Sequence, residues 1–192
     1  MKMNKQGKIT PSRFADVMTQ GRGKNEKWGK TAITYAYQVA LERLGVELPE
    51  VFAYALNWGI ENEMGAVEAY EKKTGRFIIP VDTIEHPELD FVAGTPDGLL
   101  GEDGIVEIKC PYNPVNHLAN LKTGEQIEQY KYQIQGYLWI TGCKWCDFVS
   151  FDPRFPAELQ LSVHRVERDE VLIAELSQRV IEFNELVKEV MI

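Results

Sequence analysis

Segment 104–110, GIVEIKC, restricts the fold of this chain more than any other feature of its sequence. Its β-branched residues predict a short strand, in which neighbouring side chains point to opposite faces. The side chains on one face are apolar and suit a core: Val106, Ile108 and Cys110. Glu107 and Lys109 share the other face, and a charged pair in such a strand needs a partner or a function. An exposed sheet face with a cross-strand salt bridge is the alternative interpretation.

Helix and strand patterns alternate along the rest of the chain. Periodicity and capping patterns predict helices at 10–20, 31–44, 52–73, 113–121, 126–141 and 168–191. Strands are predicted at 76–84, 89–93, 98–100, 145–151 and 158–166, with Pro80 placing the first at an edge or bulge. This order indicates an α/β fold with a mixed central sheet. The 192 residues show no repeat or long linker and are interpreted as one domain.

The two long helices before the strands carry apolar stripes at helical spacing. In 31–44 the stripe consists of Ile33, Tyr37, Ala40, Leu41 and Leu44, and in 52–73 of Leu56, Ile60, Val67 and Tyr70. Glu63 falls on the second stripe. A carboxylate that faces a core must be paired or bound to a metal, although a boundary residue that reaches solvent would share this position.

The net charge of −8 is unevenly distributed. Residues 1–30 contain eight Lys or Arg and two acids, a net +6, which leaves −14 on the rest of the chain. This asymmetry suggests a basic patch on an acidic body. A solvated, partly disordered N-terminus is the equal alternative, and the glycine- and lysine-rich segment 21–30 is predicted to be a mobile loop.

Asp97 precedes Glu107 by ten residues, within the bend Gly94-Thr95-Pro96-Asp97-Gly98. A strand, a turn and a returning strand can bring Asp97 beside Glu107 and Lys109. Two carboxylates suit Mg²⁺ or Mn²⁺, and a metal of this kind neutralises a phosphodiester and acidifies a water molecule. The lysine can hold the attacking water or stabilise the developing charge. These residues together indicate phosphodiester hydrolysis, while a structural turn aspartate is the alternative for Asp97.

Helix 126–141 offers polar side chains on one face. Tyr130, Gln133 and Tyr137 recur at spacings of three and four, so that Tyr130 and Gln133 can bind a phosphate or the attacking water, although the tyrosines would serve packing equally well. Gly136 in the helix interior costs about 1 kcal/mol relative to Ala, which predicts close approach of another element there.

The remaining features exclude other classes of protein. Three cysteines in a chain without a secretory signal argue against a disulfide framework, and the lone CxxC of Cys143 and Cys146 lacks the second pair that zinc requires. Since no apolar run is long enough to span a membrane, we expect a cytoplasmic protein.

Several ordered motifs resemble those of the phage lambda exonuclease, or YqaJ-type viral recombinase, family within the PD-(D/E)xK nucleases. They are Ile9-Thr10-Pro11-Ser12, Trp58-Gly59 with Glu63 and Ala66, Gly94-Thr95-Pro96-Asp97-Gly98-Leu99, Val106-Glu107-Ile108-Lys109-Cys110-Pro111, Tyr130-x-x-Gln133-x-Gln135 and Phe151-Asp152-Pro153-Arg154. Together they span residues 9–154, most of the chain.

The resemblance implies a restriction-endonuclease-like core and Mg²⁺-dependent 5′→3′ digestion of one strand of duplex DNA from an end. It implies two Mg²⁺ ions, replaceable by Mn²⁺, a homotrimeric ring around the DNA, a single-strand annealing protein as partner, and a phage or prophage setting in a bacterial host. Metal ligands would be Glu63, Asp97, Glu107 and the Ile108 carbonyl. Lys109 and Gln133 would act on the water, and Ser12 and Tyr130 on phosphate.

The chain departs from the family pattern near its N-terminus. Lys5 stands where the family has an arginine that serves the 5′-phosphate, and lysine lacks the bidentate fork of arginine. Thr95 replaces a serine but keeps the hydroxyl group as a candidate phosphate contact. Two rival functions remain, a structure-specific endonuclease or junction resolvase of the same fold, and a non-catalytic DNA-binding recombination scaffold.

Overall fold

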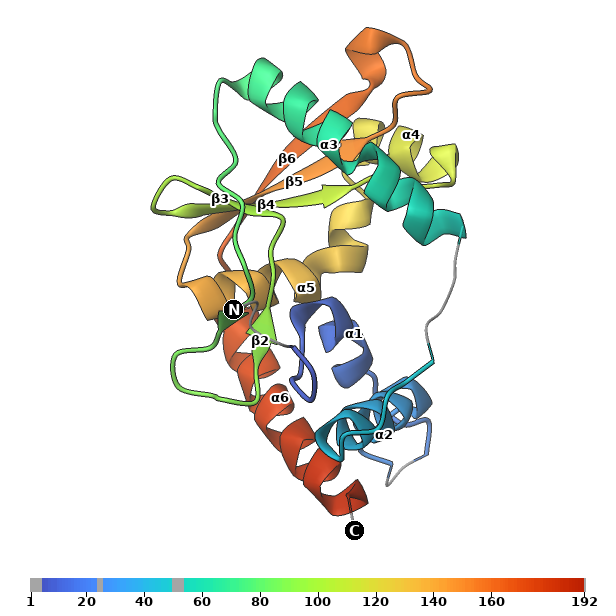
Figure 1. Cartoon of the computed structure of the whole chain (residues 1–192), viewed down its shortest axis with the longest axis vertical. Coiled ribbons are helices and arrows are strands. Elements are labelled where there is room, and N and C mark those ends of the chain that lie inside the picture. Colours follow the sequence, from blue (N-terminus) through green and yellow to red (C-terminus); the bar gives the residue numbers. More distant parts are fainter. Residues whose placement is uncertain (1–4, 24–25, 50–53, 192) are drawn as a thin grey trace.

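The computed structural model describes residues 5–23, 26–49 and 54–191. Its centre is a mixed four-stranded sheet in the order β3–β4–β5–β6 (Figure 1). The strands are β3 (Gly98–Leu100), β4 (Gly104–Lys109), β5 (Trp145–Phe151) and β6 (Leu161–Glu167). β4 and β5 are parallel, whereas β3 and β6 run antiparallel to their neighbours. The predicted mixed α/β architecture is therefore confirmed.

Two helices make the crossover that the parallel pair requires, α4 (Pro114–Thr123) and α5 (Gln126–Thr141). α4 begins where the side chain of Asn113 accepts a hydrogen bond from the backbone N–H of Val115 at 3.1 Å. It ends at Gly124, whose φ of 65° is the left-handed conformation that favours glycine at a helix end. The crossover returns the chain so that Glu107 of β4 pairs with Phe148 of β5.

Each face of the sheet is covered by one long helix. α3 (Tyr54–Thr74) contributes Tyr70 to a core that includes Val106 and Ile108. On the opposite face, α5 contributes Ile134 to a core that includes Ile105. Alternate residues of β4 therefore enter two different cores, and Glu107 lies on the α5 side.

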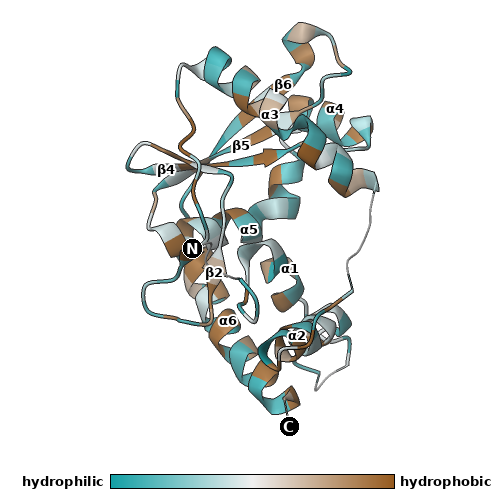
Figure 2. Cartoon of the chain, in the orientation of Figure 1, coloured by the Kyte–Doolittle hydropathy of each residue, from teal (hydrophilic) through white to brown (hydrophobic). Residues whose placement is uncertain are grey.

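A second helical layer lies below α5 (Figure 1). It contains η1 (Pro11–Arg13), α1 (Phe14–Val17), α2 (Lys30–Arg43) and α6 (Glu170–Val190). The side chain of Asp169 caps α6 by accepting hydrogen bonds from the backbone N–H groups of Val171 and Leu172, both at 3.0 Å. Hydrophobic and hydrophilic residues alternate around α6 (Figure 2), and its buried side chains include Phe183.

Gly136 confirms the predicted close approach of another element to α5. A Cβ atom at this position would lie 2.6 Å from Cδ2 of Phe14 and 3.1 Å from Cβ of Pro11. The missing side chain therefore lets the N-terminal segment pack directly against the helix that carries Gln133.

Some predicted elements are shorter than expected. Segment 76–84 forms only an isolated bridge between Ile79 and Leu99 and the two-residue strand β1 (Ile84–Glu85), which pairs with β2 (Ala93–Gly94). Pro80 has no N–H to continue the ladder. Segment 10–20 is helical only to Val17, and segment 158–166 begins as the 3₁₀ helix η2 (Ala157–Leu159) before β6.

The two predicted apolar stripes describe the core only in part, because Ala40 and Tyr70 are buried but most other members of the stripes are exposed. In α2 the buried side chains are Ala32, Tyr35, Ala36, Val39 and Ala40, while Ile33, Tyr37, Leu41 and Leu44 are exposed. In α3, Leu56 and Ile60 are 58% and 63% exposed. Periodicity identified helices correctly, but which stripe is covered depends on neighbours distant in sequence.

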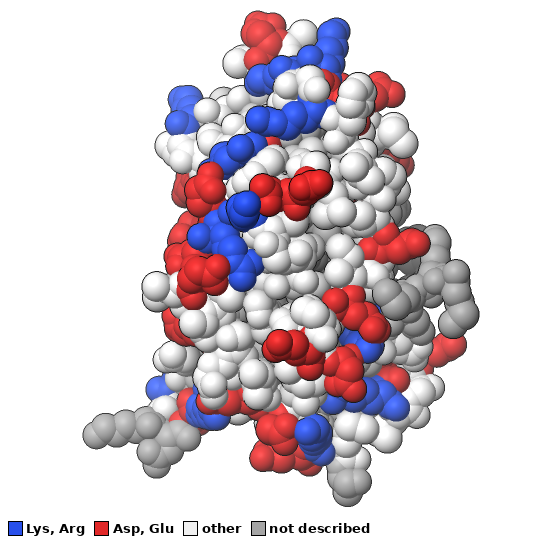
Figure 3. Space-filling view, turned by 90° about the vertical axis from the view of Figure 1, so that its left-hand side faces the viewer, with Lys and Arg blue, Asp and Glu red and all other residues white. Residues whose placement is uncertain are grey.

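The basic N-terminal segment is packed onto the body over its described part. Ile9 and Phe14 are fully buried. Lys8 pairs with Glu85 at 3.1 Å and Lys27 with Glu182 at 3.0 Å, so neither alternative for this segment describes it fully. Lys and Arg also lie among acids across the upper half of the face in Figure 3, beyond the N-terminal segment. Lys2 and Lys24 lie outside the described residues.

Cys143 and Cys146 are buried in the core between the sheet and α5, and all three cysteines are free. None of the described helices is long and apolar enough to span a membrane.

Candidate active site

Glu107 lies inside the protein and is 2% exposed. Its Oε1 atom accepts hydrogen bonds from Nζ of Lys109 at 2.5 Å and from Nε2 of Gln133 at 2.6 Å. Its Oε2 atom is buried and has no hydrogen-bond partner among the described residues. The exposed-face interpretation of the Glu107–Lys109 pair is therefore wrong, and one carboxylate oxygen remains available.

The electrostatics of this pair follow from burial. The pKa of Glu107 is raised to about 7. Burial is the largest cause, the charges of Asp97 and Glu63 act in the same direction, and Lys109 opposes the shift. Burial by itself would lower the pKa of Lys109. The charge and hydrogen bond of the adjacent Glu107 outweigh this effect, so the pKa of Lys109 is raised. A cation beside Glu107 would favour its ionised form.

Asp97 stands in the bend before β3, and its Oδ2 atom accepts a hydrogen bond from the backbone N–H of Ile108 at 2.6 Å. This bond brings the bend against β4, as the sequence spacing suggested. Burial raises the pKa of Asp97, although the Ile108 hydrogen bond and the charge of Lys109 lower it. The pairing of β3 with β4 thus brings together Asp97, Glu107 and Lys109, the three residues of the predicted centre.

A cleft of about 460 Å³ opens between the first half of α3 and the end of β4. Its lining includes Glu63, Asp97, Ile108, Lys109 and Tyr130. Glu63 is exposed, so the prediction that its carboxylate faces a core was wrong. Its charge nevertheless acts on both Asp97 and Glu107, which places it within electrostatic reach of them.

The residues fit a hard divalent cation. The donors are carboxylate oxygens, which Mg²⁺ and Mn²⁺ prefer. The unpartnered Oε2 of the buried Glu107 would be costly without a cation or a donor. Within the described residues, no three His, Cys, Asp or Glu side chains form a ready cage, so water or substrate oxygens would complete the coordination.

α5 presents Tyr130 and Gln133 to the site. Nζ of Lys109 lies 4.7 Å from the centroid of the Tyr130 ring. The second glutamine of the motif has another role, because Nε2 of Gln135 donates to the carbonyl of Glu167 at 2.8 Å and its Oε1 accepts from the backbone N–H of Asp169 at 2.9 Å. Gln135 therefore joins α5 to the start of α6.

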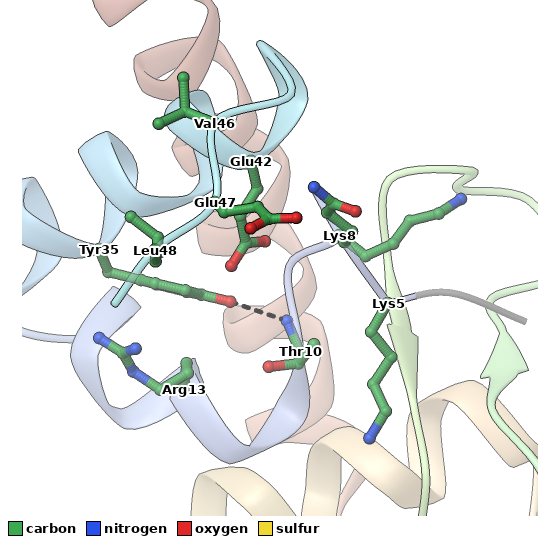
Figure 4. A pocket seen from close by; sticks show the side chains of 10 residues that line it. Lys5, Lys8, Thr10, Arg13, Tyr35, Glu42, Val46, Glu47 and Leu48 are labelled. Atoms are coloured by element: carbon green, nitrogen blue, oxygen red, sulfur yellow. Dashed lines mark hydrogen bonds between the residues drawn. The ribbon is translucent and has the colours of Figure 1, made fainter. Parts of the chain in front are cut away.

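The predicted phosphate contacts of the N-terminal segment lie beside this centre rather than in it. Lys5 lines a second cavity of about 610 Å³ with Lys8, Arg13 and Tyr35 (Figure 4), and its charge lowers the pKa of Asp97 slightly. Ser12 is exposed and does not line the cleft, and the hydroxyl of Thr95 lies 3.0 Å from that of Thr83.

Sequence reasoning missed part of the cleft wall. Leu56, Gly59 and Ile60 line it, although the stripe pattern assigned the two apolar residues to a core. Their spacing from Glu63 along one helix was the available indication. The sequence placed Arg154 in a motif but gave no sign that its Cζ atom lies 4.3 Å from the ring centroid of Trp58 on α3.

Residues 2–144 match a family model described as the YqaJ-like viral recombinase domain. The structure is similar to that of an alkaline exonuclease, LHK-Exo, from Laribacter hongkongensis, with 36% identity, a TM-score of 0.87, and coverage of 97% of this chain and 91% of that one. The complex of LHK-Exo with dAMP matches at the same identity and coverage, with a TM-score of 0.88.

A phage-related exonuclease from Haemophilus somnus 129PT shares the fold at 19% identity, with a TM-score of 0.76 and coverage of 96% of this chain and 95% of that one. A comparison with curated protein sequences found no significant match.

Proposed function

The chain belongs to the YqaJ-like viral recombinase family, and from this premise we propose that it is a Mg²⁺-dependent exonuclease that digests one strand of duplex DNA in the 5′→3′ direction from an end. Residues 1–192 would form a single nuclease domain that serves phage-type recombination in the cytoplasm of a bacterial host. LHK-Exo was crystallised with dAMP, which supports nucleotide binding at a related site.

The observation that carries this proposal is the buried carboxylate of Glu107. One of its oxygens is held by Lys109 and Gln133, and the other has no partner among the described residues. Such an arrangement is costly in a purely structural or scaffolding role, because an ionised carboxylate in a protein interior needs compensation. A divalent cation between Glu107 and Asp97 would supply it.

Each residue has a distinct part in the proposed reaction. A bound Mg²⁺ would neutralise the scissile phosphate and lower the pKa of a water molecule. Asp97, Glu107, Glu63 and the carbonyl of Ile108 would hold the metal, with two ions expected and Mn²⁺ able to substitute. Lys109 and Gln133 would orient the attacking water, because both present N–H donors beside Glu107.

The surrounding residues would bind the DNA strand. Tyr130 lies over Lys109 at the cleft and is suited to contact the phosphate near the attacked bond. Lys5, Ser12 and Thr95 would hold phosphates toward the strand end. Lysine contacts release counterions, so affinity should fall steeply with salt.

We further propose assembly as a ring of three copies that works with a single-strand annealing protein. Ile33, Tyr37 and Leu44 of the second helical layer are exposed, which supports contact between copies or with a partner.

The deciding experiment is digestion of a linear duplex labelled at either the 5′ or the 3′ end, with Mg²⁺ or with EDTA. A Lys109→Ala variant and a closed circular duplex serve as controls. Early Mg²⁺-dependent release of the 5′ label, an intact circle and an inactive variant would support the proposal. Cutting of the circle would favour a structure-specific endonuclease, and DNA binding without any product would favour a scaffold.

A further inference from the structure

The turn after β5 carries an ion pair to which the proposed reaction assigns no role. Asp152 is fully buried, and Arg154 binds it through two hydrogen bonds, Nε to Oδ1 at 2.8 Å and Nη2 to Oδ2 at 2.7 Å. Burial would raise the pKa of Asp152, but the hydrogen bonds and charge of Arg154 lower it overall. This bidentate geometry holds the guanidinium in a defined plane.

The same guanidinium contacts the two elements that flank the cleft, α3 and the segment that follows β4. Its Nη2 atom donates to the carbonyl oxygens of Pro111 at 3.2 Å and Tyr112 at 3.0 Å, in the segment that directly follows β4. Its Cζ atom lies 4.3 Å from the ring centroid of Trp58 on α3. Trp58 in turn meets the ring of Tyr112 edge-on, with centroids 6.2 Å apart. One side chain therefore joins the sheet, the end of β4 and α3.

The first half of α3 has little other anchoring. The buried side chains among the described residues of this helix are Ala66 and Tyr70, which both follow Glu63. Leu56 and Ile60, which precede it, are more than half exposed. Trp58 is five residues before Glu63 on the same helix. A shift of Trp58 would therefore also move the carboxylate of Glu63.

We propose that Arg154 is a positioning residue that, through Trp58 and the 111–112 carbonyls, sets the distance between Glu63 and the carboxylates of Asp97 and Glu107. This inference rests on the proposed function, since it concerns carboxylates that hold a divalent cation. Residues that orient metal ligands change metal affinity by about 10- to 100-fold when mutated. Lysine cannot replace Arg154, because it lacks the planar fork that bonds and stacks at once.

The chain contains a matched control for this interaction. Arg165 binds the buried Asp147 through Nε to Oδ1 at 2.8 Å and Nη2 to Oδ2 at 3.1 Å, and its Cζ atom lies 3.5 Å from the ring centroid of Trp145. The chemistry is that of the Arg154 contact, but these contacts of Arg165 involve neither the segment after β4 nor the half of α3 that precedes Glu63. Asp147 meets α3 only after Glu63 among the described residues, where its Oδ2 accepts a hydrogen bond from the hydroxyl of Tyr70 at 2.7 Å. Arg165→Lys therefore reports the structural cost of losing such a contact.

The test is calorimetric titration of the full chain with Mn²⁺ in the absence of DNA, together with urea unfolding. Arg154→Lys should weaken Mn²⁺ binding about 10-fold, whereas Arg165→Lys should bind Mn²⁺ as the wild type does and lose similar stability. Trp58→Ala should weaken Mn²⁺ binding, and Trp58→Phe, which keeps an aromatic face for the guanidinium, should restore most of it.

Equal Mn²⁺ affinity in the wild type, Arg154→Lys and Trp58→Ala would overturn the positioning role while leaving the proposed nuclease function intact. An equal loss of affinity in Arg165→Lys would also overturn it, because the effect would then be general destabilisation. A wild-type chain that binds no Mn²⁺ would refute the metal-dependent function itself, and this inference with it. If Arg154→Lys does not fold, the two Trp58 variants decide the matter.

Discussion

The Oδ2 atom of Asp97 accepts a hydrogen bond from the backbone N–H of Ile108 at 2.6 Å, which ties the bend before β3 to the end of β4. This hydrogen bond orients the carboxylate of Asp97 against the backbone of β4. The same strand carries the second carboxylate, that of Glu107. The relative position of the two carboxylates therefore depends on β-sheet register, which is rigid, rather than on side-chain freedom.

Asp97→Asn should separate the structural role of this residue from its chemical role. The amide oxygen can still accept the Ile108 N–H, so stability should change little, while the lost charge should weaken metal binding. Since a metal ion supplies several kcal/mol and each 1.36 kcal/mol is tenfold in rate, we expect at least about a 100-fold fall in DNA digestion. Asp103→Asn, at a half-exposed carboxylate paired with Lys144, is the control and should digest DNA normally. Normal digestion by Asp97→Asn would exclude it as a ligand.

The two glutamines of α5 should give opposite results. Gln133→Ala removes a donor to Glu107 and should slow digestion by about 10- to 100-fold with little loss of stability. Gln135→Ala leaves the Glu167 carbonyl and the Asp169 N–H without partners and should lower the free energy of unfolding by about 1–3 kcal/mol. The rate per folded Gln135→Ala molecule should be unchanged. Single-turnover digestion and urea unfolding of both variants measure the two effects, and a similar profile for both would contradict these assignments.

The metal-free protein should lose stability as the pH rises from about 4.5 to about 7. The pKa of Glu107 is raised to about 7 from an ordinary 4.5, mainly by burial. An acid with a raised folded-state pKa binds protons more tightly when folded, so its stabilising effect is complete below 4.5 and lost by about pH 7. Urea unfolding in EDTA across this range should show the decline, and Glu107→Gln should flatten it. Parallel curves for the two proteins would show that Glu107 does not cause the slope.

Gly136→Ala should destabilise the fold even though alanine favours helices by about 1 kcal/mol. The added Cβ would lie 2.6 Å from Phe14, and overpacking of this kind costs about 1–3 kcal/mol. Gly59→Ala in α3 is the matched control, because nothing lies within 4 Å of its Cβ position and the substitution should stabilise the helix slightly. Thermal unfolding measures the stability of both variants. A gain in stability for Gly136→Ala would show that Phe14 can move away to make room for the added Cβ atom.

The sequence by itself determined the local chemistry. Alternation in 104–110 placed Glu107 and Lys109 on one face, and the spacing to Asp97 indicated a strand, a turn and a returning strand. The presence of helices was also visible, because periodicity and capping act through residues within a few positions of one another. These features depend on short-range geometry, which neighbouring residues specify directly.

Only the tertiary structure decided which surfaces are covered and which side chains meet. Leu56 and Leu41 belong to apolar stripes that periodicity assigns to a core, but their side chains are exposed, because none of the described elements covers them. Glu107 is buried because α5 folds over it, and Arg154 reaches Trp58 across 96 positions of sequence. Burial and contact between distant residues arise from packing of the whole chain. A periodic pattern does not specify which element will cover which face of a helix or strand.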